Sequence, residues 1–392
     1  MDLRRILSLD DFEHAARRHL PRPVFAYVSG GVEDNASLRD NRAVFDELGF
    51  VPRVLLDVSK RTTATTLFGH EYAAPFGIAP MGINALSAYR GDLVLAAGAQ
   101  KANIPMIMSG SSLIPLEDVA KQSPGSWFQA YLPGEPERIL GLVDRAASAG
   151  FRTLVVTVDV AVLSNRENNI RAGFSTPLRP SLRLAWDGIT RPKWLVGTAL
   201  RTVARHGMPH FENSFATRGA PILAKDVDRD FSKKDHLNWE HLELIRKRWQ
   251  GRLVVKGLMS PEDARIARGS GVEGIIVSNH GGRQLDGTVS PLRMLPAIVD
   301  VAGKMTVMMD SGIRRGTDVM KALALGASFV FVGRPFNYAA SIAGEAGVRH
   351  AYEILQGELN RGMAQLGVNS IAELKPDKLM RIGGLRSPGM PV

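Results

Sequence analysis

The segment Ser278–Asp286 carries side chains suited to proton transfer and anion binding. It reads Ser278-Asn279-His280-Gly281-Gly282-Arg283-Gln284-Leu285-Asp286 and directly follows an apolar run, Gly274–Val277. A histidine can act as a general base, and an arginine three residues later can bind a carboxylate through two parallel hydrogen bonds. The two glycines between them allow a sharp turn and the close approach of a flat ligand. An isolated pair of this kind is more often a solvated strand end, so its position in the fold decides between the two interpretations.

Other polar residues also follow short apolar runs. Asp159 ends the run Thr157-Val158, and a carboxylate there could orient a histidine from another strand or simply cap a helix. Lys256 follows Val255, and a lysine that points inward implies an anionic or electron-rich partner because its burial is costly. Gln129 and Tyr131 alternate along one run and therefore share a face.

Two glycine- and arginine-bearing turns lie near the end of the chain. They read Asp310-Ser311-Gly312-Ile313-Arg314 and Gly333-Arg334-Pro335. Turns of this kind after the last two strands of an α/β barrel commonly hold a phosphate group through backbone N–H groups. These turns therefore predict a phosphorylated cofactor.

The elements that must position these residues show a regular alternation. Eight apolar, β-branched runs alternate with helical patterns from about residue 75 onward, which predicts an α/β fold, a TIM (β/α)8 barrel with parallel strands buried on both faces. Since catalytic residues of such barrels lie at the C-terminal strand ends, the barrel favours the chemical interpretation of His280 and Arg283. The predicted strands are Phe76–Ala79, Pro105–Met108, Trp127–Tyr131, Leu154–Val158, Leu253–Val255, Gly274–Val277, Thr306–Met309 and Phe329–Val332.

The chain of 392 residues is long enough for one such barrel with additions. Roughly 95 residues separate Val158 from Leu253, which predicts a long insertion after strand four. We therefore expect a single domain spanning 1–392. Its predicted parts are an N-terminal helical cap (1–72), a barrel (73–360) with an inserted loop (175–235), and a C-terminal tail (361–392).

Composition excludes several classes of protein. With 45% apolar residues, wholesale disorder is excluded, and with no cysteine the chain has no disulfide scaffold and no thiol catalysis. We expect no metal site, no secretory signal and no membrane-spanning helix. The net charge of +10 allows nucleic acid, an anionic membrane surface or acidic ligands, but the basic residues are scattered and no nucleic-acid motif is present, so nucleic acid is not expected.

Taken together, these residues resemble the FMN-dependent L-2-hydroxy acid oxidase and dehydrogenase family over nearly the whole chain. The segment Ser278–Asp286 is similar to the family signature, and the resemblance is closest in type to the membrane-associated (S)-mandelate and L-lactate dehydrogenases. Supporting matches are Tyr27 with Gly30-Gly31 and Asn41, Ala79-Pro80-Met81-Gly82, Trp127–Tyr131 and Thr157-Val158-Asp159.

The resemblance implies a role for each residue that handles the substrate. His280 would take a proton from the substrate, and Asp159 would stabilise the resulting imidazolium. Tyr131 would lie near the hydroxyl or keto oxygen. The substrate carboxylate would be held by Arg166, Arg283 and Tyr27.

The resemblance also implies FMN across the barrel mouth. Lys256 would face N1 and O2 of the flavin, where a cation stabilises the reduced form. The other implied contacts are the backbone of Pro80, Met81 and Gly82 and the side chains of Ser109, Gln129 and Thr157 at the ring, Ser278 as a further polar contact, Asp310 at the ribityl chain, Gly312 in the following turn, and Arg314, Gly333 and Arg334 at the phosphate.

The insertion suggests where the electrons go. Between Ser175 and Lys225 it holds eight Lys or Arg residues against two acids, interleaved with Trp186, Trp194 and several leucines. This pattern is typical of a segment that lies on an anionic membrane surface, although a solvated basic loop over the active site has the same composition. We expect residues 178–215 to contact the membrane.

These expectations combine into one function and its rivals. The predicted activity is oxidation of a lactate- or mandelate-type L-2-hydroxy acid to the 2-keto acid, with quinone as acceptor, at the cytoplasmic face of the inner membrane. The main alternative is a soluble cytoplasmic oxidase that reduces O2 to H2O2. A redox-silent FMN barrel and a non-enzymatic lipid- or nucleic-acid-binding protein are more distant rivals. The family resemblance further implies a homotetramer.

Overall fold

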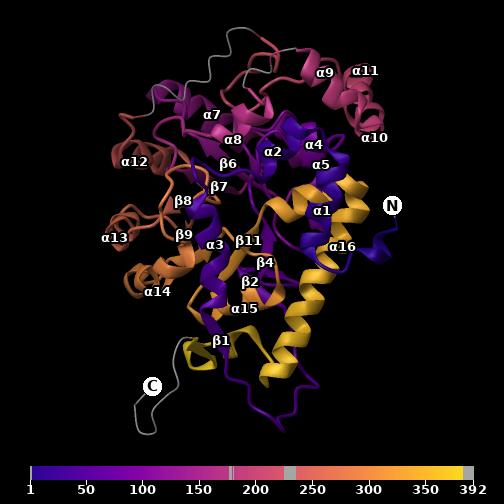
Figure 1. The fold of residues 1–392 in the computed structure, drawn as a ribbon. Helices are drawn as coiled ribbons and strands as arrows, with labels where there is room; N and C mark the ends of the chain where they lie inside the picture. The colour runs from indigo at the N-terminus through magenta and orange to yellow at the C-terminus, as the bar shows by residue number, and fades with distance from the viewer. Residues whose placement is uncertain (1, 176–178, 180, 225–234, 383–392) are drawn as a thin grey trace.

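The computed structural model describes residues 2–175, 179, 181–224 and 235–382. Its centre is a parallel sheet in the order β4-β11-β10-β9-β8-β7-β6-β5 (Figure 1). A parallel bridge from Ile78 to Met106 joins its two edges and closes the sheet into a barrel. The predicted TIM barrel is therefore confirmed. The strands are β4 (Phe76–Ile78), β5 (Ile107–Ser109), β6 (Trp127–Tyr131), β7 (Thr153–Thr157), β8 (Arg252–Leu258), β9 (Gly274–Val277), β10 (Thr306–Met309) and β11 (Phe329–Val332).

Helices surround the barrel because their apolar stripes face the strands. Two of them begin where a serine precedes a proline: Ser260 and Ser290 cap α13 and α14 by accepting the backbone N–H of the second residue that follows each serine. The covering helices are α5 (Gly91–Lys101), α6 (Leu116–Gln122), α7 (Pro136–Ser148), α12 (Trp239–Arg248), α13 (Pro261–Gly269), α14 (Pro291–Ala302), α15 (Gly316–Ala324) and α16 (Arg334–Leu366).

The N-terminal region is helical only in its first two thirds. It contains η1 (Leu3–Arg5), α1 (Leu9–His19), α2 (Arg22–Ser29) and α3 (Ala36–Asp46). It then forms short strands, where the sequence suggested a helical cap up to residue 72. Strand β1 (Leu48–Phe50) pairs with β12 (Leu379–Arg381), and β2 (Thr65–Leu67) forms a hairpin with β3 (His70–Tyr72). The hairpin buries Leu67 and Tyr72 in one cluster with barrel-interior residues such as Val155 and Ile276, so that end of the barrel is closed.

The C-terminal boundary also differs from the expectation. Helix α16 continues to Leu366, beyond the predicted barrel end at 360, and bends at Ala343 and Gly344. Two short 3-10 turns follow it, η3 (Ile371–Glu373) and η4 (Pro376–Lys378).

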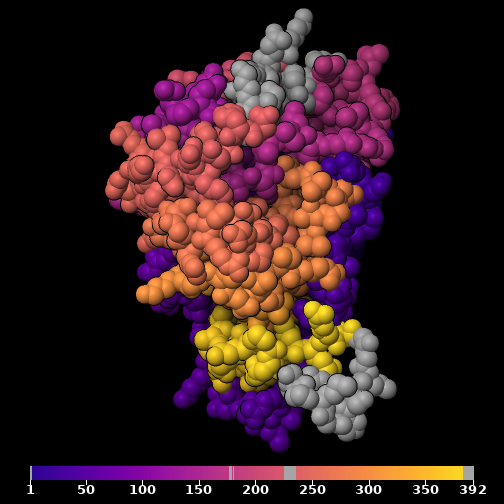
Figure 2. Space-filling view, turned by 90° about the vertical axis from the view of Figure 1, so that its left-hand side faces the viewer, coloured from indigo at the N-terminus to yellow at the C-terminus, as the bar shows by residue number. Residues whose placement is uncertain are grey.

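The insertion after β7 forms helices at one end of the molecule. It contains α8 (Glu167–Ala172), α9 (Leu182–Ile189), α10 (Pro192–Trp194), a π-helical stretch η2 (Leu195–Leu200) and α11 (Arg201–His206). Figures 1 and 2 show these magenta segments at the end opposite the yellow C-terminal residues around β12. Residues 176–178, 180 and 225–234 of the predicted insertion, of which 178 and 180 also belong to the predicted membrane segment, lie outside the described residues. Within the described part of the chain, no helix combines the length and hydrophobicity needed to span a bilayer.

Candidate active site

A cavity of about 540 Å³ is lined by residues that follow the barrel strands. Strand ends, the loop after β7 and the helices α2, α8 and α16 all contribute to it. Most of the predicted site residues line it: Tyr27, Pro80, Met81, Gly82, Tyr131, Thr157, Arg166, Lys256, His280, Arg283, Asp310, Gly312, Arg314, Gly333 and Arg334. Ser109, Gln129, Asp159 and Ser278 are buried or nearly buried beside these residues. The structure therefore brings together residues that are up to about 300 positions apart in the sequence.

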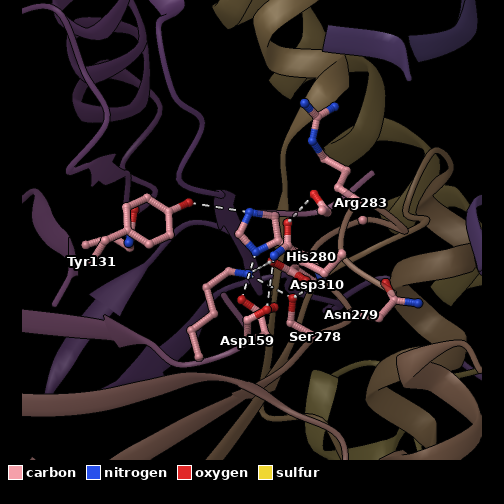
Figure 3. A network of polar contacts seen from close by, with 12 residues as sticks. Tyr131, Asp159, Ser278, Asn279, His280, Arg283 and Asp310 are labelled. Carbon is pink, nitrogen blue, oxygen red and sulfur yellow. Dashed lines mark hydrogen bonds and ion pairs between the residues drawn. The ribbon is translucent and has the colours of Figure 1, made fainter. Parts of the chain in front are cut away.

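His280 lies between two polar partners (Figure 3). Its Nδ1 is 2.8 Å from Oδ1 of Asp159, and its Nε2 is 3.4 Å from the hydroxyl of Tyr131. The backbone N–H of His280 donates to Ser278 Oγ at 3.0 Å. Because ionised Asp159 can only accept, the hydrogen bond places the histidine proton on Nδ1 and leaves the lone pair of Nε2 facing the cavity. This is the tautomer that a general base requires.

The backbone around His280 has an unusual conformation. His280, Gly281 and Gly282 have φ values of 56°, 69° and 71°, a region that side chains disfavour. A Cβ at Gly282 would lie 2.6 Å from the backbone nitrogen of Leu38. The paired glycines therefore allow the tight turn that aims the histidine, and the strain at His280 itself is typical of a functional site.

Electrostatics keep the two partners in complementary states. Burial lowers the pKa of His280, an effect that the Asp159 charge and hydrogen bond oppose. Burial acts to raise the pKa of Asp159, but the charge and hydrogen bond of His280, together with the charge of Lys256, outweigh it and lower that pKa. Neutral histidine beside ionised aspartate is the resting state of a base that is poised to accept a proton.

Three arginines surround the cavity without an acidic partner among the described residues. Arg283 Nη1 donates to the carbonyls of Tyr27 and Gly30 at 2.7 and 2.8 Å, and Arg334 donates to the carbonyls of Val28 and Gly30 at 2.9 Å. Burial lowers the pKa of Arg283 to about 9 and that of Arg334 to about 10.

The third of these arginines is oriented by side chains. Nη2 and Nε of Arg166 donate to Gln284 Oε1 at 2.6 Å and to Ser164 Oγ at 2.9 Å. Three arginines without an acidic partner around one cavity favour anionic ligands, either a carboxylate or a phosphate.

Lys256 is buried in the cavity wall. Its Nζ donates to Ser278 Oγ at 2.8 Å and forms an ion pair with Asp310 at 3.0 Å, while Asp310 also accepts from Ser311 Oγ at 2.9 Å. The sequence interpretation placed Asp310 at a ribityl chain, and the structure adds that Asp310 is the counter-ion of Lys256.

The chemistry of the wall fits a flavin nucleotide. Gln129 accepts from Ser109 Oγ at 3.1 Å, but its Nε2 is buried with no hydrogen-bond partner among the described residues. Such a donor is costly to leave unpaired, and a ligand carbonyl against β6 would satisfy it. Arg314 and Arg334 beside Gly312 and Gly333 supply the positive turn for a phosphate.

Sequence reasoning missed an apolar wall of the cavity. Phe174 packs on the ring of Tyr27 with centroids 4.7 Å apart. The other members come from the loop after β7 and from α8, namely Val160, Val162, Leu163 and Ile170. The run Val160-Ala161-Val162-Leu163 directly after Asp159 was the available signal, because contiguous apolar residues beyond a strand end indicate a surface that contacts a ligand or a partner.

Comparisons with known proteins agree with this chemistry. The model of the family "FMN-dependent dehydrogenase" matches residues 16–381. The chain is 38% identical to (S)-mandelate dehydrogenase of Pseudomonas putida, with 96% of this chain and 95% of that protein covered, and 39% identical to L-lactate dehydrogenase of Ectopseudomonas mendocina, with 96% and 99% covered.

Solved structures are similar over the same extent. A structure described as monotopic membrane protein (S)-mandelate dehydrogenase has a TM-score of 0.89 and 37% identity, covering 96% of this chain and all of that one. A mandelate oxidase structure has a TM-score of 0.79 and 34% identity, covering 97% and 99%. Both a dehydrogenase and an oxidase are thus among its structural relatives.

Proposed function

The chain belongs to the family of FMN-dependent dehydrogenases, and on that premise we propose that it oxidises a lactate- or mandelate-type L-2-hydroxy acid to the 2-keto acid. The observation that carries this proposal is the position of His280. It is oriented by Asp159, faces Tyr131 and lies in a cavity whose lining includes Arg166, Arg283 and Arg334, three arginines that lack acidic partners among the described residues. A base next to an anion-binding site is what a 2-hydroxy carboxylate requires.

In the proposed reaction, His280 Nε2 accepts a proton from the substrate. The charge of Asp159, 2.8 Å from Nδ1, stabilises the imidazolium that results. The hydroxyl of Tyr131 donates to the substrate oxygen. When bound, FMN would supply the acceptor for the two electrons and the second hydrogen that the substrate loses, so the oxidation to the 2-keto acid balances.

The substrate carboxylate binds to Arg166, Arg283 and Tyr27. Arg166 is held in place by Gln284 and Ser164, so little side-chain entropy is lost when it binds the carboxylate. Arg283 uses Nη1 for backbone carbonyls, which leaves its other guanidinium hydrogens for the ligand. The apolar wall of Val160, Val162, Leu163, Ile170 and Phe174 then receives the substrate side chain.

We place FMN along the rest of the cavity. The backbone of Pro80–Gly82 and the side chains of Thr157, Gln129 and Ser109 would hold the ring. Arg314, Arg334 and the turns at Gly312 and Gly333 would hold the phosphate, and Lys256, with Ser278 and Asp310, would supply positive charge to the polar edge of the ring. We also infer that residues 1–392 act as one unit, because Tyr27 of α2, the barrel strands and Arg334 of α16 line the same cavity.

Quinone is the proposed electron acceptor, and an anionic membrane surface is the proposed partner of residues 178–215. Leu182, Trp186, Ile189 and Leu200 are 92%, 67%, 61% and 54% exposed, although burying such side chains is favourable. Arg183, Lys193 and Arg205 are exposed among them. Apolar burial combined with attraction to anionic lipid is what holds a protein on one face of a bilayer.

Vesicle flotation tests this docking surface. The FMN-loaded protein should float with vesicles that contain phosphatidylglycerol and float less with pure phosphatidylcholine vesicles. The double variant Trp186→Ser/Leu200→Ser should lose flotation and retain turnover with a soluble dye. Leu55→Ser is the matched control, since Leu55 is fully exposed and follows β1, which lies at the other end of the molecule (Figure 1). Unchanged flotation of the double variant would exclude this surface.

Turnover assays separate the two possible acceptors. With substrate present, a quinone reductase reaction should proceed in air with little oxygen consumption. Rapid oxygen uptake with stoichiometric H2O2 would instead identify an oxidase. We place the protein at the cytoplasmic face of the inner membrane as a peripheral homotetramer. Size-exclusion chromatography with light scattering of the detergent-free protein tests the tetramer.

A further inference from the structure

A buried polar network lies next to the part of the cavity wall formed by Met81 and Gly82. Its members are Asn84, Asp92, Ser112 and Asn337, and each is no more than 2% exposed. Asp92 belongs to the first turn of α5, and Asn84 is the first residue of the short helix α4 (Asn84–Ser87). The proposed chemistry does not use any of these four side chains.

Hydrogen bonds connect the network to the wall. Asn84 Nδ2 donates both to Asp92 Oδ1 at 2.9 Å and to the backbone carbonyl of Met81 at 2.8 Å. Asp92 Oδ2 accepts from Ser112 Oγ at 2.7 Å. Asn84 Oδ1 accepts from Asn337 Nδ2 at 2.7 Å.

These bonds allow only one orientation of the Asn84 amide. Ionised Asp92 can accept but not donate, so the NH2 group of Asn84 must face it. The same NH2 group then reaches the carbonyl of Met81, and the amide oxygen meets the NH2 group of Asn337. A rotated amide would place its oxygen against the acceptors of Asp92 and Met81, with no proton between them. Asp92 therefore determines how Asn84 binds the wall.

The backbone at this wall needs such support. Ile83, which directly follows Gly82, has a φ of 51° although it is not a glycine. A β-branched residue in the left-handed region is strained, and α4 has only four residues and no side-chain cap at its N-terminus. Strained backbone of this kind persists only where tertiary contacts hold it.

We propose that Asp92 is a positioning residue that acts through Asn84 to hold the Met81–Gly82 backbone in the shape that receives the flavin ring. This inference rests on the proposed position of FMN against Pro80–Gly82. It assigns to a buried carboxylate that does not itself line the cavity an effect, transmitted by Asn84, on how tightly and in what geometry the cofactor is bound.

The network requires an acceptor at position 92 rather than a charge. Burial raises the pKa of Asp92 to about 6. A protonated Asp92 can donate to Ser112 Oγ, because that hydroxyl also lies 3.3 Å from the carbonyl of Ile114 and can donate there instead. Asp92 Oδ1 meanwhile still accepts from Asn84. An asparagine at position 92 can form the same pattern, whereas a leucine cannot.

FMN titration of the apoprotein tests the proposal. Asp92→Leu should weaken FMN binding about tenfold or more, as expected when a buried hydrogen-bonding group loses its partner, and should change the visible circular dichroism of the bound flavin. Asp92→Asn should bind FMN with an affinity within about threefold of wild type and should show the wild-type circular dichroism. Asp118→Leu is the matched control, since Asp118 pairs with Arg90 at 2.7 Å beside the same helix but lies outside the network, and it should leave FMN binding unchanged.

Two results would overturn the proposal. Wild-type FMN affinity and circular dichroism in Asp92→Leu would show that the network does not act on the wall. A loss in Asp92→Asn as large as that in Asp92→Leu would show that the acceptor toward Asn84 is not what matters. If Asp92→Leu does not fold, Asn84→Leu takes its place, with the same expected loss and the same contrary result. These titrations need no hydroxy acid. If no hydroxy acid reduces the flavin of the wild type, the proposed function is refuted, but FMN binding by the Asp92 variants still tests the role of Asp92.

Discussion

The substitution Asp159→Asn removes one charge from the proposed catalytic pair and leaves its shape. Asp159 Oδ1 lies 2.8 Å from His280 Nδ1, and both side chains are less than one fifth exposed. Two unit charges about 4 Å apart interact by about 4 kcal/mol at an effective dielectric constant of about 20. The asparagine amide keeps a neutral hydrogen bond of about 1 kcal/mol to Nδ1. The remaining loss of about 3 kcal/mol predicts a decrease in the rate of flavin reduction of about 100-fold.

Anaerobic stopped-flow measurement of FMN bleaching by (S)-mandelate and L-lactate reports this rate directly. The acid limb of the pH–rate profile should also move to lower pH in Asp159→Asn, because the charge of Asp159 raises the pKa of His280 and its removal lowers that pKa further. Asp144→Asn is a suitable control, since Asp144 pairs with Arg248 on the surface at 2.6 Å. A rate within about threefold of wild type would refute the assigned role of Asp159, because it corresponds to less than about 1 kcal/mol.

Three further changes have defined outcomes. Arg283→Lys should lower kcat/KM by about 10- to 100-fold through loss of a charged, two-point contact to the carboxylate, and an unchanged kcat/KM would remove Arg283 from substrate binding. Gly282→Ala should lower the free energy of unfolding by about 2 kcal/mol or more, because the φ of residue 282 is 71° and the added Cβ would approach Leu38 N to 2.6 Å. Chemical denaturation measures this free energy, and a variant as stable as wild type would contradict the described turn. Folding raises the pKa of Asp92 from 3.8 to about 6, so the folded protein binds this proton more tightly and loses about 3 kcal/mol of stability as the pH rises from about 4 to 6. Asp92→Asn should abolish this part of the pH dependence of thermal unfolding. An identical pH profile in the variant would show that Asp92 does not titrate in this range.

The strands and the residues at their ends could be predicted because local pattern determines them. Parallel strands that are buried on both faces must be continuous apolar runs, and β6, β9, β10 and β11 have the predicted bounds. Polar residues such as His280 and Lys256 at the ends of such runs meet at one mouth once the barrel closes. The barrel topology thus converts a one-dimensional list of strand ends into a site.

What could not be predicted depends on contacts between distant segments. The hairpin β2–β3 is stable because Leu67 and Tyr72 pack under the barrel, and its own short sequence has no strong strand signal. Lys256 within β8 pairs with Asp310 directly after β10, and the sequence suggested a role for each residue but not their contact. The Asp92 network could not be predicted either, because buried side chains that share hydrogen bonds follow no regular spacing along the sequence.

The most direct test of the central claim is the anaerobic absorbance spectrum of the FMN-loaded protein mixed with 2-hydroxy acids. For the wild type, (S)-mandelate or L-lactate should bleach the flavin while the opposite enantiomers do not. His280→Gln should keep FMN and reduce it about 100- to 10,000-fold more slowly, the usual effect of losing a general base. A flavin that no 2-hydroxy acid bleaches, or a His280→Gln variant that is reduced as fast as wild type, would contradict the account.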